Sequence, residues 1–410
     1  MTTIWRFESN GWPRDRLHAI DMPYPNARDD DAKAQPGRSS TAEHTAYLAA
    51  EVRRVLATTG ASGVALVGNS RGGYPIRNFV ANGGSGLVSQ VVLCGVPNHG
   101  VWAHNSFLPG SEFNGIGPFL TRLNAPQGPE GNEVAPGIRW MTIRSDHDDK
   151  YAQPDGVWIG QRGRPTNVSF EGPALKGAEN VVIAGVDHRE TAFSAKAFAE
   201  MYRFIAGKPA ATPAIVPEAS VVLDGVVSGL GLNNAEGSYS TNLPLVGASV
   251  EVYATNAASG ERLGAAVHRK TIGNDGHWGP FAADGAATYE FVVAAPGYAT
   301  THIYRSPFSR SSDIVSLHPE RMVDADRDAK SLVMLNRSRG YFGVPRDRIA
   351  LDGVSPPAGL PPGVPGISNV RVKVANTAGR AVVGEFNDER IVGRAWPAAE
   401  NQIVVLDLTS

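Results

Sequence analysis

The chain has 410 residues, of which 42% are hydrophobic and 19% charged, and its formal net charge is −2. This composition predicts a globular protein of two or three domains and excludes a disordered one, and the near-neutral charge gives no electrostatic basis for binding nucleic acid. The single cysteine, Cys94, excludes an intrachain disulfide, and its place in an apolar run favours a small buried hydrophobe over a reactive thiol. No apolar run approaches the ~20 residues of a membrane-spanning helix.

The first part of the chain alternates predicted helices with short apolar strands. A helix is expected from Thr41, as its N-cap, to about Leu56, and another at 193–204, before Gly207. Four short apolar runs, each bounded by turn signals, predict strands buried on both faces of a parallel sheet, at 64–67, 91–93, 140–143 and 181–183. The alternation predicts an α/β sandwich with right-handed crossovers for residues 1–208.

A long connection at 98–137 joins the second and third of these strands. It contains several aromatic and aliphatic residues. One interpretation is a lid over an apolar binding pocket, and the alternative is a packed surface excursion.

Residues 209–219 form a proline-rich linker, and residues 220–410 read as an all-β region. Strands are expected within it at 246–253, 289–293, 370–374 and 403–406, with a turn at 274–276. The region is either one body or two subdomains, 220–320 and 321–410. Four aromatic residues form either an exposed apolar face or part of the core: Trp278, Phe281, Tyr298 and Tyr304.

The pentapeptide Gly68-Asn69-Ser70-Arg71-Gly72 carries the strongest chemical signal. It has the form G-x-S-x-G, follows the strand at 64–67 directly and leads into a helical stretch, which is the setting of a nucleophile elbow. We interpret Ser70 as a nucleophile and the backbone N–H of Arg71 as an oxyanion donor. Both flanking glycines are expected to leave room for neighbouring backbone. The alternative is an ordinary polar turn.

A base and an acid are expected after the later strands. His188 follows the strand at 181–183 and is the expected general base. After the strand at 140–143 three aspartates compete for the acid role. Asp149 fits best, because Tyr151 can anchor its loop, whereas Asp148 comes next and Asp146 last. Asp187, beside the histidine, is interpreted as a solvated loop residue.

These motifs resemble those of bacterial lipases and esterases of the α/β-hydrolase superfamily, whose triad has the chain order Ser, Asp, His. The chain is most similar to the Archaeoglobus-type lipases that carry a C-terminal β lipid-binding domain, through segments at 6–13, 202–209 and 304–308. The resemblance implies a serine carboxylic-ester hydrolase that forms an acyl-enzyme through Ser70, His188 and Asp149. It implies no cofactor and no metal. The implied partners are an ester or lipid substrate and a lipid or polymer surface.

Two departures from the resembled enzymes leave alternatives open. Those enzymes have an upstream strand and His-Gly turn that supply the second oxyanion donor. Here the sheet is expected to lack its first strands, so either the chain is truncated or another residue supplies that donor. In the Archaeoglobus-type lipases the acid follows the strand that here ends before Gly95-Val96-Pro97.

Two other functions fit the same residues. One is a polyester depolymerase of the polyhydroxyalkanoate type. The other is a catalytically weak or inactive hydrolase-fold protein that binds lipid or polymer. The residues do not specify the natural substrate, acyl-chain length, oligomeric state or compartment, and an extracellular location is expected only if an upstream signal has been lost.

Overall fold

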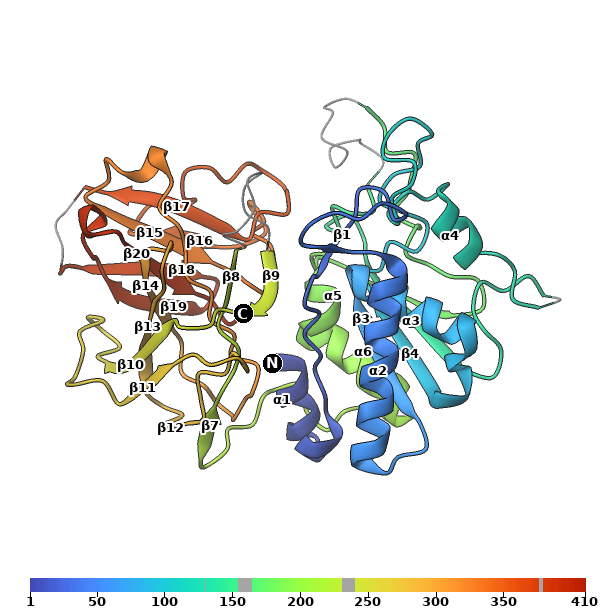
Figure 1. The fold of residues 1–410 in the computed structure, drawn as a ribbon, viewed down its shortest axis with the longest axis horizontal. Helices are drawn as coiled ribbons and strands as arrows, with labels where there is room; N and C mark the ends of the chain where they lie inside the picture. Colours follow the sequence, from blue (N-terminus) through green and yellow to red (C-terminus); the bar gives the residue numbers. More distant parts are fainter. Residues whose placement is uncertain (129, 154–163, 231–239, 376–378) are drawn as a thin grey trace. The chain divides into compact units, whose positions relative to one another are not determined.

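The structure is a computed structural model that describes residues 1–128, 130–153, 164–230, 240–375 and 379–410 (Figure 1). The chain divides into two compact units. One consists of Thr2–Ala214, and the other of Ile215–Ser410 together with Met1. No helix in the described ranges is long and apolar enough to cross a membrane.

The N-terminal unit is built on a sheet of four parallel strands in the order β3-β4-β5-β6. They are β3 (Val64–Asn69), β4 (Val88–Cys94), β5 (Arg139–Ser145) and β6 (Glu179–Ile183). Each contains one of the four predicted apolar runs, so the predicted parallel sheet is confirmed. The expectation that all four strands are buried on both faces was wrong for the outer strands β3 and β6, which expose Val67 and Val182. In the part of the chain that the structure describes, β3 lies at an edge, and its Val67 is 42% exposed.

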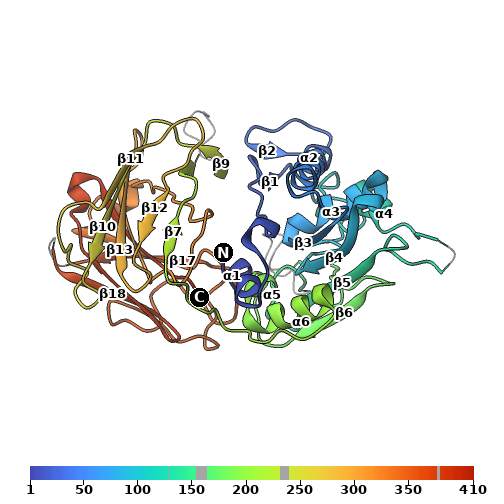
Figure 2. The same ribbon diagram turned by 90° about the horizontal axis from the view of Figure 1, so that it is seen from below.

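Helices cover both faces of this sheet (Figure 2). On one face lie α2 (Thr41–Thr59) and α3 (Gly73–Phe79), and on the other α1 (Thr2–Ser9), α5 (Glu190–Phe193) and α6 (Ala195–Ala206). The alternation of side chains along β4 explains the two layers: Val91 and Leu93 pack with α2 and α3, whereas Val92 and Cys94 pack with α1 and α6.

The helix ends follow from capping chemistry. Ser40 is the N-cap of α2, because its side chain accepts a hydrogen bond from the Glu43 N–H while the Glu43 carboxylate accepts one from the Ser40 N–H. The expectation that Thr41 is the cap was therefore one residue too late. Gly60 and Gly207, both with positive φ, end α2 and α6.

The connection at 98–137 is largely packed against the unit. It includes α4 (Pro118–Leu123), whose Phe119, Leu120 and Leu123 join the core on the α2 and α3 side. Val101 and Trp102 form a separate small cluster. These contacts fit the packed interpretation for residues 118–123. Before α2, the short strands β1 (Asn26–Ala27) and β2 (Arg38–Ser39) pair in parallel.

The C-terminal unit is all-β, as predicted. Its main sheet has the order β11-β10-β13-β14-β20-β15-β17. These strands are β10 (Ser249–Thr255), β11 (His268–Thr271), β13 (Thr288–Ala294), β14 (Thr300–Arg305), β15 (Ser331–Asn336), β17 (Asn369–Val374) and β20 (Gln402–Asp407). Smaller sheets are formed by β7 (Val221–Leu223) with β12 (Phe281–Ala283), by β8 (Ser228–Leu230) with β9 (Ser240–Pro244), and by β16 (Ile349–Leu351), β18 (Ala381–Phe386) and β19 (Glu389–Arg394).

The strand β20 joins the two halves of the main sheet. It runs parallel to β14 on one side and to β15 on the other. Strands from before and after residue 320 therefore share one sheet, and a division into subdomains at that point is not seen. The four aromatic residues in question are all less than 10% exposed, which places them in the core: Trp278, Phe281, Tyr298 and Tyr304.

Candidate active site

Ser70 lies on a strained turn between β3 and α3. Its φ is +52°, a left-handed conformation that residues other than glycine seldom adopt. A short 3₁₀ turn at Ser70–Gly72 then leads directly into α3. A serine held on a strained strand-to-helix turn matches the geometry of a nucleophile elbow.

The glycines around Ser70 are needed to different degrees. A Cβ atom at Gly68 would lie 2.8 Å from both the Gly72 carbonyl oxygen and the Ile76 Cδ1, so this position requires glycine. A Cβ at Gly72 would meet nothing within 4 Å, and the expectation for that position was wrong. The crowded second glycine is Gly73, where a Cβ would lie 2.3 Å from Cγ2 of Val96.

His188 and Asp149 form a buried pair. The His188 Nδ1 lies 2.9 Å from Oδ1 and 3.0 Å from Oδ2 of Asp149, and both side chains are about 97% buried or more. Because a carboxylate only accepts hydrogen bonds, Nδ1 carries the proton in this pair. The other ring nitrogen, Nε2, is buried and has no hydrogen-bond partner among the described residues. That nitrogen is available to accept a proton.

The neighbouring aspartates are arranged differently. Asp146 Oδ1 accepts a hydrogen bond of 3.3 Å from the Gly185 N–H, so Asp146 ties the end of β5 to the histidine loop. Burial opposes ionisation of Asp146, but hydrogen bonds from the Gly185 and His147 N–H groups outweigh it and lower its pKa. Asp148 is half-buried. Of the three competing aspartates, the structure brings Asp149 to the histidine.

Asn69 connects the serine turn with the histidine loop. Its Nδ2 donates to the carbonyl oxygens of Cys94, at 2.8 Å, and His188, at 3.1 Å. Gly95, with a φ of +56°, lies against the same loop, since a Cβ there would be 2.8 Å from the His188 carbonyl oxygen. The residue before Ser70 therefore lies beside His188. The sequence analysis did not predict the contact of Asn69 with His188, because Asn69 occupies a variable position of the pentapeptide. It did not predict the contact of Gly95 with the same loop either.

Tyr151 covers the histidine ring. The two ring centroids are 4.3 Å apart, and the Tyr151 N–H donates to Asp149 Oδ1 at 2.9 Å. The tyrosine also belongs to a small apolar cluster on the 98–137 connection, which we call the aromatic cluster: Val101, Trp102, Phe107, Leu108, Phe113 and Tyr151. An apolar surface therefore adjoins the histidine.

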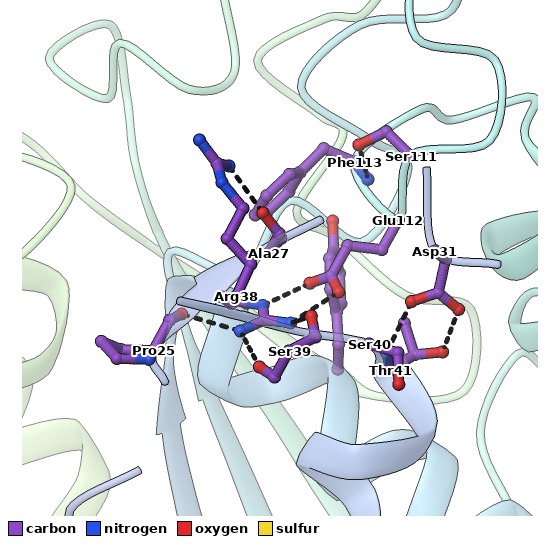
Figure 3. Close-up of polar contacts among 12 residues, drawn as sticks. Pro25, Ala27, Asp31, Arg38, Ser39, Ser40, Thr41, Ser111, Glu112 and Phe113 are labelled. Carbon is purple, nitrogen blue, oxygen red and sulfur yellow. Dashed lines mark hydrogen bonds and ion pairs between the residues drawn. The ribbon is translucent and has the colours of Figure 1, made fainter. Parts of the chain in front are cut away.

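The Arg71 side chain is buried, although sequence reasoning considered only its backbone. Its guanidinium donates to both carboxylate oxygens of Glu112, to the carbonyl oxygens of Pro25 and Ser39, and to the Ser39 hydroxyl. Figure 3 shows Pro25, Ser39 and Glu112 gathered around these bonds. Because Glu112 lies 41 residues further along the chain, no local pattern indicates this pairing.

Two further predictions can be compared with the structure. Asp187 is fully buried and accepts hydrogen bonds from the N–H groups of Arg189 and Glu190 at the start of α5, so its interpretation as a solvated residue was wrong. Cys94 is buried, and burial raises the pKa of its thiol to about 12, so it is the inert hydrophobe that was predicted. No cluster of three or more His, Cys, Asp or Glu side chains in the described ranges could hold a metal ion.

Comparisons with known proteins give one family match. The family model of the lipase C-terminal domain matches residues 219–322. No curated protein matches the chain.

Similar solved structures include lipase B from Aspergillus fumigatus, at 16% identity over 42% of this chain and 43% of that one, with a TM-score of 0.32. A lipase from Bacillus licheniformis in propeptide form is 12% identical over 62% and 79%, with a TM-score of 0.29. An esterase from Rhodococcus is 18% identical over 44% and 78%, with a TM-score of 0.25. The chain thus spans less than half of the Aspergillus lipase.

The predicted fold class is confirmed by the parallel sheet with helices on both faces, the serine turn that follows β3, and the β-rich second unit. The narrower resemblance to Archaeoglobus-type lipases stays a prediction. The chain combines a unit of the α/β-hydrolase arrangement with a region, residues 219–322, that is similar to the lipase C-terminal domain.

Proposed function

We propose that this protein is a serine carboxylic-ester hydrolase of the lipase or esterase type. The observation that carries the proposal is the buried pair of His188 and Asp149, together with the hydrogen bond by which Asn69 ties the histidine loop to the turn of Ser70. A histidine whose Nδ1 is held by a carboxylate presents Nε2 as a base, and a serine on an elbow presents its hydroxyl.

The proposed reaction has two steps. In the first, Ser70 Oγ attacks the ester carbonyl carbon while His188 Nε2 takes its proton, and the same nitrogen then protonates the departing alcohol. In the second, His188 Nε2 takes a proton from a water molecule that attacks the acyl carbon, and the proton passes to Ser70 Oγ as the bond between the acyl carbon and Oγ breaks. Asp149 stabilises the imidazolium in both steps. The Arg71 N–H donates a hydrogen bond to the oxyanion, and losing one such donor typically lowers kcat by about 10²–10³.

Two features support an apolar acyl or alkyl group in the substrate. The aromatic cluster adjoins His188 through Tyr151. Residues 219–322 match a domain that bears the name of lipases. Burial of apolar substrate surface against such side chains contributes roughly 25 cal/mol per Å². Longer acyl chains are therefore expected to lower KM.

The test is hydrolysis of p-nitrophenyl esters from acetate to palmitate by the wild type and by Ser70→Ala. The matched control is Ser89→Ala, since Ser89 is exposed and its side chain, among the described residues, bonds only to the Val64 carbonyl. The proposal predicts turnover that disappears in Ser70→Ala and persists in Ser89→Ala. Turnover that survives in Ser70→Ala would contradict it.

A hydrolase-fold lipid-binding protein with weak catalysis is the second candidate. One observation favours it: the buried His188 Nε2 has no hydrogen-bond partner among the described residues, so the Ser70 hydroxyl does not engage the base in this structure. Tight binding of vesicles or long-chain esters without Ser70-dependent turnover would favour this candidate. Clearing of solid polyhydroxyalkanoate without hydrolysis of emulsified triglyceride would instead favour a depolymerase.

A further inference from the structure

The ion pair between Arg71 and Glu112 has every guanidinium hydrogen bond in place. Arg71 Nε lies 2.7 Å from Glu112 Oε1, and Nη2 lies 2.9 Å from Oε2. The other three N–H groups donate to Pro25 O at 2.7 Å, Ser39 Oγ at 2.8 Å and Ser39 O at 2.7 Å. Arg71 is 8% exposed and Glu112 1%. All five N–H groups of the Arg71 guanidinium therefore donate a hydrogen bond, and the side chain next to Ser70 is fixed by them.

These bonds hold three separate segments together. Besides the serine turn, they fix the β1–β2 segment and the part of the 98–137 connection that carries Glu112. The last two segments are also joined directly, because the Asp31 N–H donates to the Gly110 carbonyl at 3.0 Å. The Asp31 carboxylate in turn accepts hydrogen bonds from the N–H and hydroxyl of Thr41, the first residue of α2, as Figure 3 shows. Glu112 thus belongs to a network of hydrogen bonds that connects the serine turn, the β1–β2 segment and the start of α2.

Stability alone does not account for such a pair. Removing two charges from water costs several kcal/mol per ion, and apolar replacements of buried ion pairs are often neutral or stabilising. Burial raises the pKa of Glu112 even though Arg71 lies beside it and lowers it. The pair therefore carries a desolvation cost, and what it supplies in return is fixed geometry.

We propose that Glu112 is a positioning residue for ester hydrolysis: by gripping the Arg71 guanidinium, it fixes the orientation of the Arg71 backbone N–H that stabilises the oxyanion. This inference rests on the proposed function. The physical reason is that the peptide between Ser70 and Arg71 cannot rotate freely when the Arg71 side chain is anchored at its far end. Oxyanion donors act through preorganisation, so a small rotation weakens them in the transition state but not in the substrate complex.

The first variant is Glu112→Gln, which keeps the size of the side chain and removes the charge and the bidentate contact. The expected result is a kcat lower by about 10–10²-fold, with KM changed by less than about threefold. This decrease in kcat is smaller than the decrease expected when an oxyanion donor is lost altogether, because the Arg71 N–H is still present. Rates are expressed per active site, counted by fluorophosphonate labelling of Ser70. This count removes any contribution from misfolded protein.

The matched control is Glu290→Gln in the C-terminal unit. Glu290 is fully buried and its carboxylate is likewise bidentate to an arginine, Arg262, at 2.6 and 3.2 Å. This variant is expected to unfold more easily while its kcat per labelled site stays within about twofold of the wild type. The comparison separates loss of a buried carboxylate from loss of Glu112 in particular.

A second readout is the affinity for a trifluoromethyl ketone, which forms a tetrahedral adduct with the serine and presents an oxyanion. The proposal predicts that Ki for Glu112→Gln rises by about the same factor as kcat/KM falls. A merely structural role predicts an unchanged Ki and an unchanged kcat per labelled site, together with a lower melting temperature. That second pattern would overturn the proposal.

The double variant Arg71→Met with Glu112→Leu covers the case in which Glu112→Gln does not fold. It removes both charges, so folding is expected to recover, but turnover per labelled site is expected to stay low because nothing grips residue 71. Recovery of full turnover would overturn the positioning role. Failure of the proposed function looks different: the wild type itself would show no Ser70-dependent turnover, and both proposals would fall together.

Discussion

The side-chain amide of Asn69 donates a 3.1 Å hydrogen bond to the backbone carbonyl of His188, although the two residues are 119 positions apart in the chain. The same amide bonds to the Cys94 carbonyl at the end of β4 at 2.8 Å. One side chain therefore links three chain segments that meet at the carboxyl edge of the sheet. Asn69 is adjacent to Ser70 in the chain, so this contact ties the serine turn to the histidine loop.

Replacing Asn69 by alanine is expected to lower both stability and turnover. The Cys94 and His188 carbonyl groups each lose a hydrogen bond, although the Thr191 hydroxyl still donates to the His188 carbonyl at 2.6 Å, and each lost bond typically costs about 0.5–1.5 kcal/mol of unfolding free energy. The histidine loop also loses its tie to the serine turn, so kcat is expected to fall about tenfold. Denaturant unfolding and ester hydrolysis measure the two effects. Asn82→Ala is the control, since Asn82 is exposed and its side chain, in the part of the chain that the structure describes, bonds only to Asn78. Equal effects of the two variants would contradict the role of Asn69.

Gly95→Ala is expected to impair turnover more than its backbone conformation alone explains. A Cβ at this position would lie 2.8 Å from the His188 carbonyl oxygen and 3.1 Å from His188 Nδ1. Gly60 has a similar positive φ, but a Cβ there meets nothing within 4 Å. Gly60→Ala is therefore expected to cost only the left-handed penalty of about 1–2 kcal/mol and to leave kcat unchanged. If Gly95→Ala behaves in the same way, His188 does not rest against this glycine.

Three substitutions distinguish the competing acids. Asp149→Asn is expected to lower kcat by about 10⁴-fold, because an amide cannot hold the histidine in the required tautomer or stabilise its charged form. Asp146→Asn keeps an oxygen that can accept from the Gly185 N–H and is expected to change kcat by less than about fivefold. Asp148→Asn is expected to behave like Asp146→Asn. A larger loss in either of these than in Asp149→Asn would reassign the acid.

Lys150 is expected to make stability depend on pH. Burial, with a smaller contribution from Arg189, lowers the pKa of its ammonium group to about 8. Below this pH the amine is charged in both the folded and unfolded states, and the cost of burying the charge is present. As the pH rises from about 8 towards the unfolded value of about 10.4, the folded state binds fewer protons than the unfolded state, so stability rises.

Lys150→Met removes this contribution. The variant is expected to be more stable than the wild type at about pH 7, and the difference is expected to shrink at about pH 9.5. Denaturant unfolding of both proteins at the two pH values measures this difference in unfolding free energy. The contributions of the other titrating groups cancel because they are the same in the two proteins. A difference that grows with pH would contradict a lowered pKa for this amine.

The four strands of the parallel sheet were predictable from the sequence, whereas most strands of the C-terminal unit, such as β14 and β15, were not expected, and strand ends were less predictable than strand centres. Runs such as Val91–Leu93 are apolar at every position because both faces of the sheet are covered, so they are visible without knowing what covers them. Ends depend on single contacts. Ser40 caps α2 through reciprocal hydrogen bonds with Glu43. The strand β10 begins at Ser249, three residues after the predicted start.

For the candidate site, local patterns indicated single residues but not their contacts. Ser70 was identifiable because an elbow imposes its strain within five residues, and His188 because it follows a late strand. The bonds from Asn69 to His188 and from Arg71 to Glu112 join residues that only the folded chain brings together. The donors of these bonds, Asn69 and Arg71, occupy the variable positions of the pentapeptide, where the motif permits any residue.

The parallel position of β20 between β14 and β15 has a consequence for the order in which the two units mature during synthesis. Every strand and helix of the N-terminal unit precedes residue 207, so this unit can fold while the rest of the chain is still being made. The C-terminal sheet cannot close until residue 407 has been added, because β20 supplies the pairing partner of both neighbours. Until then β14 and β15 each present an open backbone edge, of the kind that can pair with strands of other chains.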